Sequence, residues 1–349
     1  MQKRGSSSNP ESRFIHTKRE MEESDLDPDA VSSPSTELFA DKSRTVLSSN
    51  ESPDVPFSQS VNPYRGCEHG CSYCYARPTH EYLDLSAGID FESKIFVKYD
   101  AAKLLKEEIS KKSYKPDVIC FSGVTDSYQP IERKLQITRA CLSVLREFRN
   151  PVSIITKNHL ITRDVDILGE MAKDNLSCVL VSVTTLDENI RSRMEPRAST
   201  AARRLETIRF LSDHGIPVGV LVAPVIPGLT DHEIPAILKV VKEAGASFAG
   251  YVMLRLPHGL KELFLEWLGT NFPNQKKKVT DRILDIRGGT LYDSSFGTRG
   301  RGEGAFAEQI QSLFRLSLKK FALNSVGPKL RTDLFEPVQG LLFPDPNKS

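Results

Sequence analysis

The sequence predicts an α/β fold in which parallel strands form a barrel or a partial barrel, with a C-terminal helical extension and a disordered N-terminal tail. Apolar runs rich in Val, Ile and Leu alternate about six times with amphipathic segments between residues 94 and 254. Such runs are typical of buried parallel strands joined by right-handed crossovers. The residues before this region are polar, and those after it have a helical pattern. An open doubly wound sheet is the alternative architecture.

The first 55 residues are rich in Ser, Pro, Asp, Glu and Lys, and their apolar residues are scattered. Such a segment cannot bury enough apolar surface to offset the entropy lost on folding, so we expect residues 1–55 to be disordered. The composition changes near Val61, and we place the core domain at 56–255.

The elements of the core domain follow from this pattern. We expect strands at 94–98, 117–123, 151–157, 177–185, 217–226 and 248–254. We expect helices near 100–112, 131–149 and 163–174, a broken helix reaching 214, and a helix at 231–244. Asp187, Thr200 and Asp231 are the expected N-caps, because their side chains can accept hydrogen bonds from free backbone N–H groups. Gly215 and Gly245 are expected to end their helices.

Three further helical patterns follow residue 256, in "LKELFLEWLGTNF", the Lys-rich stretch 275–286 and "GAFAEQIQSLFRLSLKKF". We expect residues 256–325 to pack on the barrel as a helical extension. Residues 326–349 carry Pro and little pattern, so we expect a tail there. In both candidate architectures the functional residues lie in the loops after the carboxyl ends of the strands.

The overall charge is close to neutral, with 47 Lys and Arg against 45 Asp and Glu, so it gives no argument for a nucleic-acid or membrane partner. No apolar run reaches about eighteen residues, as a membrane span would require. Basic residues at the start have no apolar stretch behind them, so we expect no secretory signal. Six cysteines, three of them clustered, do not resemble a disulfide framework. We therefore expect the protein to reside in the reducing cytoplasm.

Half of the cysteines lie in "RGCEHGCSYCYARPTH", where Cys67, Cys71 and Cys74 have the spacing C-x3-C-x2-C. Gly66 and Gly70 allow this loop to fold tightly around a compact object. Three thiolates on one loop can hold three corners of a [4Fe–4S] cluster. The fourth iron then has no protein ligand, and such an open position is what a reactive metal centre needs to bind a substrate or a cofactor.

A zinc site is the alternative for the same spacing. Its fourth ligand would be His69 or His80, which gives a Cys3His set. The protein would then be a zinc-stabilised nucleic-acid-binding protein without catalysis. Zinc knuckles sit in small domains, whereas this loop enters a long series of strands and helices, so the context favours the cluster.

The same residues resemble a known family. Cys67, Cys71, Tyr73 and Cys74 match the C-x3-C-x-Φ-C motif of radical S-adenosylmethionine (SAM) enzymes, in which Φ is aromatic. The resemblance extends over about residues 60–255 and implies that family's partial (β/α)6 barrel. The tyrosine-flanked "CSYCY" is similar to the branch that contains spore photoproduct lyase. The stretches "TDSYQPIERKLQITR", "VAPVIPGLTDHEIP" and "RGGTLYDSSFGTRGRGEG" are similar to uncharacterised relatives in that branch.

The resemblance implies an iron–sulfur enzyme. Its [4Fe–4S] cluster, held by Cys67, Cys71 and Cys74, would chelate SAM at the open iron. One electron, from a donor such as flavodoxin or ferredoxin, would cleave SAM to methionine and a 5′-deoxyadenosyl radical, which takes a hydrogen atom from the substrate. The reaction would be of the lyase or transferase type, and DNA or RNA is a candidate substrate.

Cofactor contacts in this family lie at the ends of strands 2 to 4. After strand 2 many members have Gly-Gly-Glu; this chain has "SGVTDS", so Gly123, Thr125 and Asp126 would serve there. Asp126 could accept a hydrogen bond from the ammonium group of SAM, or it could cap the following turn. Tyr73, the aromatic residue of the motif, is a further cofactor candidate.

Lys157 ends strand 3 and resembles the lysine of the lyase that meets the cofactor, so we expect it to contact the carboxylate or ribose of SAM. On strand 4, Ser182 or Thr184 could contact the ribose. Strand alternation places both on one face, so the sequence does not choose between them. Tyr73 and Tyr75 resemble the relay tyrosines of the lyase and are the catalytic candidates.

One departure from the lyase concerns its hydrogen-donating cysteine. That cysteine follows strand 2 in Cys-Thr-Ser-Asp, whereas the comparable stretch here reads "GVTD". Thymine-dimer repair is therefore not implied. Cys120, Cys141 and Cys178 lie inside apolar strands or a helix, and we expect them to be buried small apolar residues.

Basic residues gather at the expected substrate face. They are Arg191, Arg193, Arg197, Arg203 and Arg204 after strand 4, and Arg299 and Arg301 in "GTRGRGEG". Clustered arginines can grip phosphates. The alternative is that some of them pair with Glu188, Glu195 or Glu206. The lysine run 276–278 is expected to form a solvated helix face.

Overall fold

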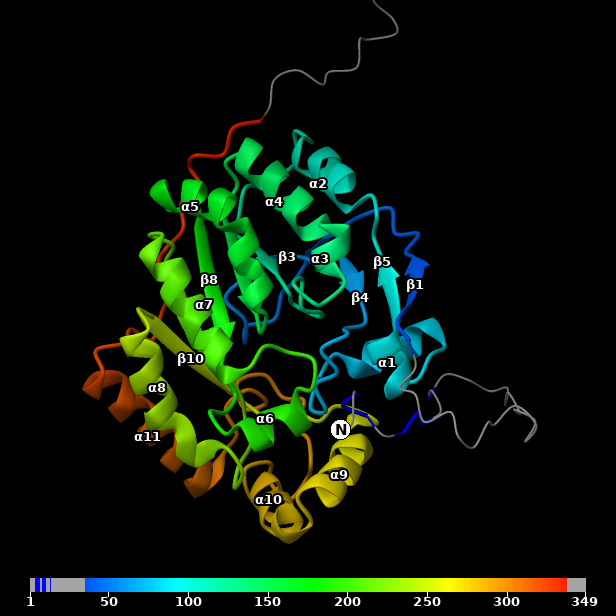
Figure 1. The fold of residues 1–349 in the computed structure, drawn as a ribbon, viewed down its shortest axis with the longest axis vertical. Coiled ribbons are helices and arrows are strands. Elements are labelled where there is room, and N and C mark those ends of the chain that lie inside the picture. Colours follow the sequence, from blue (N-terminus) through cyan, green and yellow to red (C-terminus); the bar gives the residue numbers. More distant parts are fainter. Residues whose placement is uncertain (1–3, 7, 11–12, 14–34, 338–349) are drawn as a thin grey trace, which may run out of the picture.

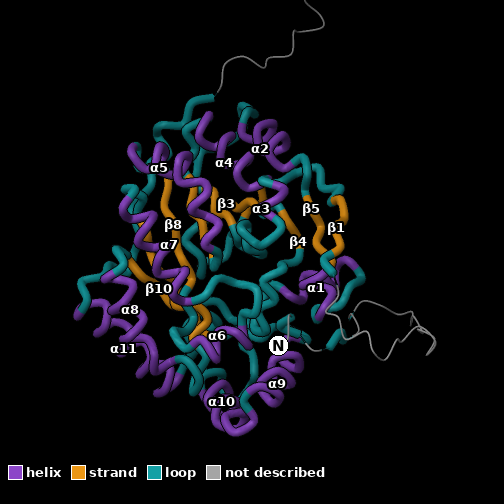
Figure 2. The backbone as a smooth tube through the Cα atoms, in the orientation of Figure 1, coloured by secondary structure: helices purple, strands orange, loops and turns teal. Residues whose placement is uncertain are grey.

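A seven-stranded sheet in the order β10-β9-β8-β7-β6-β3-β2 organises the computed structural model, which describes residues 4–6, 8–10, 13 and 35–337 (Figures 1 and 2). Its strands are β2 (Leu47–Ser49), β3 (Gln59–Val61), β6 (Ile119–Phe121), β7 (Val152–Thr156), β8 (Ser177–Ser182), β9 (Val218–Val225) and β10 (Phe248–Met253). The six from β3 to β10 pair in parallel, and β2 pairs antiparallel with β3. The predicted α/β class is confirmed, and in the described residues the sheet has two edges, as a partial barrel does.

Helices follow the sheet strands in the predicted alternation. They are α2 (Ala101–Ile109), α3 (Glu132–Leu135), α4 (Ile137–Glu147), α5 (Val165–Lys173), α6 (Glu188–Met194), α7 (Ala201–Asp213) and α8 (Ile234–Glu243), with short 3-10 segments η3 (His159–Asp164) and η4 (Asp231–Glu233). Figure 1 shows α2, α4, α5, α7 and α8 following one another along the outer side of the sheet. Their apolar faces and the Val- and Ile-rich strands form one continuous core.

The helix ends test the expected caps. Asp187 accepts hydrogen bonds from the N–H groups of two following residues, and Thr200 accepts one from three residues on, so both N-caps are confirmed. Gly215 and Gly245 have φ of 72° and 104°, which confirms their position after helix ends. Asp231 was the wrong cap: its carboxylate accepts from the N–H of the loop residue three positions earlier (2.6 Å), and α8 starts only at residue 234.

The first strand of the sheet differs from the prediction. Residues 94–97 form β5 (Lys94–Val97), which belongs to a separate sheet of order β1-β5-β4 with β1 (Glu37–Ala40) and β4 (Tyr64–Arg65). In the main sheet that place is taken by β3, which precedes β4 and the loop that carries Cys67, Cys71 and Cys74 (the cysteine loop). The three residues of β3 include two polar ones, which is too short a run to give a periodic signal.

The expected disorder of residues 1–55 is wrong for β1 and β2. These strands find partners in β5 and β3, distant in sequence, and composition carries no signal for such pairing. Residues 4–6 also contact the core domain, because the N–H groups of Gly5 and Ser6 donate to the carboxylate of Glu92. The rest of the expected tail, at 1–3, 7, 11–12 and 14–34, lies outside the described residues.

The C-terminal region contains the three expected helices, α9 (Leu260–Asn271), α10 (Pro273–Asp285) and α11 (Gly304–Lys320). Ile310 and Phe314 of α11 join the main core, beside α8 (Figure 1). Helices α9 and α10 join a second core that includes Cys71 and Tyr73 of the cysteine loop. Residues 326–337 have no helix or strand, and 338–349 lie outside the described residues. No described helix is both long and apolar enough to cross a membrane.

The contact between β9 and β10 at Gly219 gives a test of this packing. A Cβ atom at Gly219 would lie 2.1 Å from the buried ring of Phe248, so Gly219→Ala must displace that ring. We expect the free energy of unfolding, measured in urea, to fall by about 1–3 kcal/mol. The matched control is Gly250→Ala on β10, whose methyl group would make an ordinary 3.5 Å contact with Leu221. We expect the free energy of unfolding of this control to change by less than about 1 kcal/mol. Equal losses in the two variants would contradict the close contact between Gly219 and Phe248.

Candidate active site

The cysteine loop runs from β4 to the 3-10 segment η2 (Arg77–Leu83) and is fixed by its backbone. The N–H of Cys67 donates to the carbonyl of Phe91 (2.9 Å). Gly66 and Gly70 have φ of 82° and 65°, which confirms the expected tight folding at both glycines. A side chain at Gly66 would also collide with His80 and with the Phe91 carbonyl.

The three thiols of the loop are free and largely buried. Cys67 and Cys71 are 7% and 8% exposed, and all six cysteines are free thiols, as expected. Burial raises the pKa of the Cys71 thiol to about 12 and that of the Cys67 thiol well above its usual value. Asp126, Cys71 and Cys74 add to the rise at Cys67, so the three thiols lie in one electrostatic neighbourhood. Thiolates at this position need a metal centre to stabilise them.

The thiols fit a cluster better than a single ion. In the described part of the chain, no group of three or more His, Cys, Asp or Glu side chains is placed to hold one metal ion. A zinc ion needs its sulfur ligands about 2.3 Å from one centre, whereas a cubane cluster binds each cysteine at a separate corner. Three thiols can occupy three corners of such a cluster, whereas a single zinc ion would need a fourth ligand from another residue.

The two histidines considered as a fourth zinc ligand differ. Both ring nitrogens of His69 are engaged: Nδ1 lies 3.4 Å from the Asp126 carboxylate, and Nε2 lies 3.0 Å from the Asn158 amide. His80 contacts the Lys94 carbonyl through Nε2 (2.9 Å), and its Nδ1 is buried without a partner among the described residues. Burial lowers the pKa of His80 to about 4. The zinc alternative therefore depends on His80.

Asp126 lies beside the loop, but its carboxylate is already engaged. It accepts hydrogen bonds from the Thr156 hydroxyl (2.8 Å) and from the N–H groups of Lys157 (2.8 Å) and Tyr128 (2.9 Å). Burial would raise its pKa, but His69 and these donors lower it to about 2, so the carboxylate stays ionised. Asp126 thus joins the ends of β6 and β7. Its capping role is observed, and its contact with SAM stays a prediction.

Gly123, Thr125 and Lys157 lie at the same edge of the sheet. The carbonyl of Gly123 accepts a hydrogen bond from the Tyr75 hydroxyl, and the Thr125 hydroxyl donates to a backbone carbonyl (3.3 Å). The Nζ atom of Lys157 lies 5.9 Å from the centre of the Tyr73 ring. The Lys157 charge also lowers the pKa of two of the cysteine thiols, which burial raises. The structure therefore places Lys157 next to the motif.

A buried ion pair between Glu195 and Arg204 lies behind the loop. Glu195 also accepts hydrogen bonds from the Thr184 hydroxyl (2.7 Å) and from the Tyr73 hydroxyl. Burial would raise the pKa of Glu195, but Arg204, Lys157 and the hydrogen bonds lower it to about 2. The sequence identified Glu195 only as one possible partner of nearby arginines. Its contact with Tyr73 joins residues 122 positions apart, for which the sequence holds no signal.

The structure separates the two hydroxyl groups that the sequence left equivalent. The Thr184 hydroxyl lies 2.7 Å from Glu195 and 3.1 Å from the Ala223 carbonyl. The Ser182 hydroxyl is buried and has no hydrogen-bond partner in the described structure. A buried polar group without a partner is rare in proteins and indicates a missing ligand or water. Ser182 is therefore the hydroxyl that remains available.

The two tyrosines of the motif face different surroundings. Tyr73 is buried, whereas Tyr75 is 48% exposed. The Tyr75 hydroxyl is bonded to Gly123, after β6, and the guanidinium of Arg255, after β10, lies 5.3 Å from its ring centre. In a flat sheet β6 and β10 would be about 19 Å apart, at about 4.8 Å per strand. These contacts therefore indicate that the sheet curves around Tyr75.

The arginines after β8 are paired. Arg191 pairs with Glu188, Arg197 with Glu68, Arg203 with Glu206 and Arg204 with Glu195, while Arg193 donates to the carbonyl of Asn271. The pairing alternative is confirmed for Arg191, Arg203 and Arg204, whose partners are the three predicted glutamates. A substrate phosphate would have to displace an existing partner to bind here.

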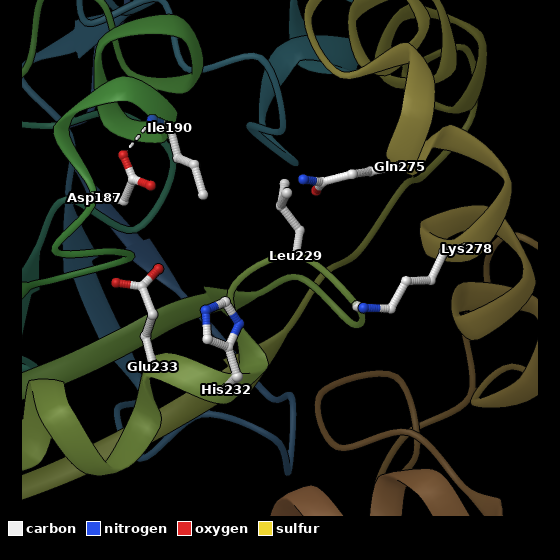
Figure 3. Close-up of a pocket in the computed structure, with 8 residues that line it drawn as sticks. Asp187, Ile190, Leu229, His232, Glu233, Gln275 and Lys278 are labelled. Carbon is white, nitrogen blue, oxygen red and sulfur yellow. Dashed lines mark hydrogen bonds between the residues drawn. The ribbon is translucent and has the colours of Figure 1, made fainter.

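A pocket of about 440 Å³ opens beside α6, between the loop after β9 and α10 (Figure 3). Asp187, Leu229, His232, Glu233 and Lys278 are among its lining residues. The Glu233 carboxylate is engaged by a hydroxyl and by a backbone N–H group (2.7 Å) of the loop before α6. None of the predicted cluster or cofactor ligands lines this pocket, so we do not assign the reaction to it.

Comparison with known proteins identifies the family of the chain. The family model described as "Radical SAM superfamily" matches residues 61–241, more than half of the chain. An uncharacterized protein of Mycobacterium tuberculosis is 34% identical over 221 residues, which are 63% of this chain and 65% of the relative. An uncharacterized protein of Methanocaldococcus jannaschii is 28% identical over 173 residues, 50% of this chain and 62% of the relative. The chain thus spans less than two thirds of the length of these relatives.

Solved structures share the fold. Spore photoproduct lyase complexed with dinucleoside spore photoproduct superimposes with a TM-score of 0.58, covering 81% of this chain and 79% of that chain at 15% identity. At this identity the likeness concerns the fold alone. It agrees with the expected partial barrel.

The Glu195–Arg204 pair gives a test of the site's framework. Glu195→Gln would leave the Arg204 charge buried without its partner, so we expect the free energy of unfolding to fall by about 3–5 kcal/mol. The control is Glu206→Gln, which breaks the pair with Arg203, in which both side chains are exposed (56% for Arg203 and 53% for Glu206). Its removal should leave the free energy of unfolding close to that of the wild type, because solvent screens an exposed ion pair. Urea unfolding of the cluster-free protein measures both, and similar losses would show that the buried pair has no special structural role.

Proposed function

Because the chain belongs to the radical SAM superfamily, we propose that it is an enzyme in which Cys67, Cys71 and Cys74 bind a [4Fe–4S] cluster and SAM binds beside it. The observation that carries the proposal is the arrangement of three free thiols, two buried and one half-buried, on one loop that contains two glycines, next to Lys157. When bound, the cluster and SAM supply one-electron cleavage of SAM and removal of a hydrogen atom from a substrate.

The protein itself would contribute a site from which water is excluded and in which the polar groups are preorganised. Helices α9 and α10 pack against Cys71 and Tyr73, which limits access of water to the loop. Two carboxylates near the loop are engaged within the protein: Glu195 pairs with Arg204, and Asp126 accepts hydrogen bonds from Thr156, Lys157 and Tyr128. A preorganised polar shell of this kind does not need to rearrange during the reaction.

For SAM we propose contacts from Lys157 and Ser182. Lys157 has a charged Nζ beside the Tyr73 ring, and Ser182 has a buried hydroxyl without a partner among the described residues. Asp126 would act mainly by fixing the backbone of Lys157. Gly123 and Thr125 would line the same edge of the sheet.

For the substrate we propose a nucleic acid, DNA or RNA. The spore photoproduct lyase structure of the same fold holds a dinucleoside photoproduct, which supports this class. Thymine-dimer repair itself is not proposed, because "GVTD" at 123–126 lacks the cysteine of that lyase. The reaction would be of the lyase or transferase type, with flavodoxin or ferredoxin as the electron donor. We further propose a cytoplasmic location, which the six free thiols support.

The cluster ligands are tested by anaerobic reconstitution with iron and sulfide. We expect the wild type to bind the cluster and to form 5′-deoxyadenosine from SAM under reductant, and Cys67→Ala to lose both. Cys120→Ala and Cys178→Ala are matched controls, because these thiols are also buried but lie in β6 and β8. Cleavage of SAM by the Cys67 variant would contradict the proposal.

His80 separates the cluster from the zinc alternative. Since its Nδ1 atom is the one available histidine donor near the loop in the described structure, a Cys3His zinc site should lose its metal in His80→Gln. For the cluster we expect the iron and sulfide content of that variant to equal that of the wild type. Stoichiometric zinc in the wild type, lost in His80→Gln, would favour the non-catalytic alternative.

Lys157 tests the cofactor site. We expect Lys157→Met to weaken SAM binding about 10- to 100-fold, as the loss of a charge-assisted hydrogen bond predicts. Equilibrium dialysis of the reconstituted protein without reductant measures this affinity. The control is Lys173→Met, at the end of α5 and away from the loop. An unchanged affinity in the Lys157 variant would exclude a direct contact.

A further inference from the structure

Arg255 is a cation at the mouth of the barrel without an anionic partner. It follows β10 by two residues, at the carboxyl end of a parallel strand, where barrel enzymes place their functional groups. Its Nε atom is buried and has no hydrogen-bond partner, and no ion pair joins Arg255 to another residue of the described structure. Its guanidinium instead lies 5.3 Å from the ring centre of Tyr75.

A second arginine, Arg287, lies behind Arg255. It is 3% exposed and donates hydrogen bonds to the carbonyls of Leu254 (2.8 Å) and Thr298 (2.9 Å). Its Nε atom also has no partner within the described residues. Burial lowers the pKa of Arg287, and the nearby Arg255 charge lowers it further. Two like charges are thus held close together, which costs stability unless an anion joins them.

The nearest carboxylates are engaged elsewhere. Asp54 pairs with Arg299 and accepts a hydrogen bond from the N–H of Gly297 (2.7 Å). Asp293 accepts hydrogen bonds from the side chain of Thr298 and from a backbone N–H group in the same loop. Neither forms an ion pair with Arg255 in the described part of the chain, so both carboxylates act on the two arginines only from a greater distance.

Tyr75 sets the orientation of Arg255 and its distance from the cysteine loop. The tyrosine directly follows Cys74 in sequence, and its hydroxyl is tied to the carbonyl of Gly123 across the mouth. A guanidinium held over an aromatic ring keeps its planar set of donors, which matches two oxygens of a phosphate. The exposed half of the ring offers a surface on which a base can stack.

We propose that Arg255 binds a phosphodiester group of the substrate, with Tyr75 orienting its guanidinium and Arg287 adding positive charge behind it. The inference rests on the proposed function, because it needs a nucleic acid at the mouth of the barrel. It also explains why the five arginines after β8, all engaged within the protein, are not needed for this contact. Arg255 would select phosphate-bearing substrates. It would place them beside Tyr75, the residue that follows Cys74 of the cysteine loop.

The test measures binding, without turnover. A fluorescein-labelled deoxythymidine decamer is titrated with the reconstituted full chain under anaerobic conditions, and fluorescence anisotropy is followed over a series of salt concentrations. We expect Arg255→Gln to bind about 10- to 100-fold more weakly than the wild type. The slope of log affinity against log salt should fall by about one. Arg255→Lys, which keeps the charge and loses the planar donor set, should lie between the two.

The control is Arg203→Gln, whose side chain is exposed and paired with Glu206 on α7, and we expect wild-type binding from it. Wild-type affinity and salt slope in Arg255→Gln would overturn the proposal, as would failure of the wild type to bind the decamer. Equal affinity of the wild type for an acidic peptide of matched charge would overturn the assignment to a phosphodiester. Cleavage of SAM by the wild type is assayed in parallel, and its failure would contradict the proposed function separately.

Discussion

Burial of three thiols on one short loop is the constraint on which the rest of the site depends. Burial favours their neutral forms, so thiolates can exist there only with a metal centre. The charged groups around the loop do not supply enough compensation: the Asp126 and Glu195 carboxylates raise the pKa of nearby thiols, and the cations that lower it leave all three thiols with a raised pKa. Lys157 is one of the positive groups at the loop and lies beside the aromatic residue of the motif, while Arg77 bonds the Cys71 carbonyl.

The two tyrosines of the motif lie in different environments, one on the inner and one on the outer side of the cysteine loop. On the inner side, Tyr73, Thr184 and Glu195 form a closed hydrogen-bonded network at the ends of the strands. On the outer side, Tyr75 spans from the end of β6 to Arg255 beyond β10 and remains half exposed. Tyr73 and Tyr75 are only two residues apart, yet Tyr73 is buried in the interior and Tyr75 lies exposed at the mouth of the barrel. In the proposed function, this division would separate the place where the cofactor binds from the place where a substrate enters.

The sequence was sufficient wherever the signal is local. Long Val- and Ile-rich strands, the helix caps at Asp187 and Thr200, and the position of Lys157 at the end of β7 follow from short-range patterns. It was insufficient where contacts join distant segments. The strand β3 is too short to show a period, and β5 finds its partners in another sheet. The contact between Glu195 and Tyr73 depends on tertiary packing, and so does the lack of a hydrogen-bond partner at Arg255 Nε in the described structure. No sequence motif predicts either of them.

The claim that matters most is that the loop holds a four-iron cluster with one iron left open to SAM. Mössbauer spectroscopy of protein reconstituted with ⁵⁷Fe tests it directly, because it distinguishes the iron sites of a cluster. We expect four-iron clusters in which a single site changes its isomer shift when SAM is added. Iron sites that all keep their parameters with SAM present, or a preparation that binds zinc and no cluster, would contradict the claim.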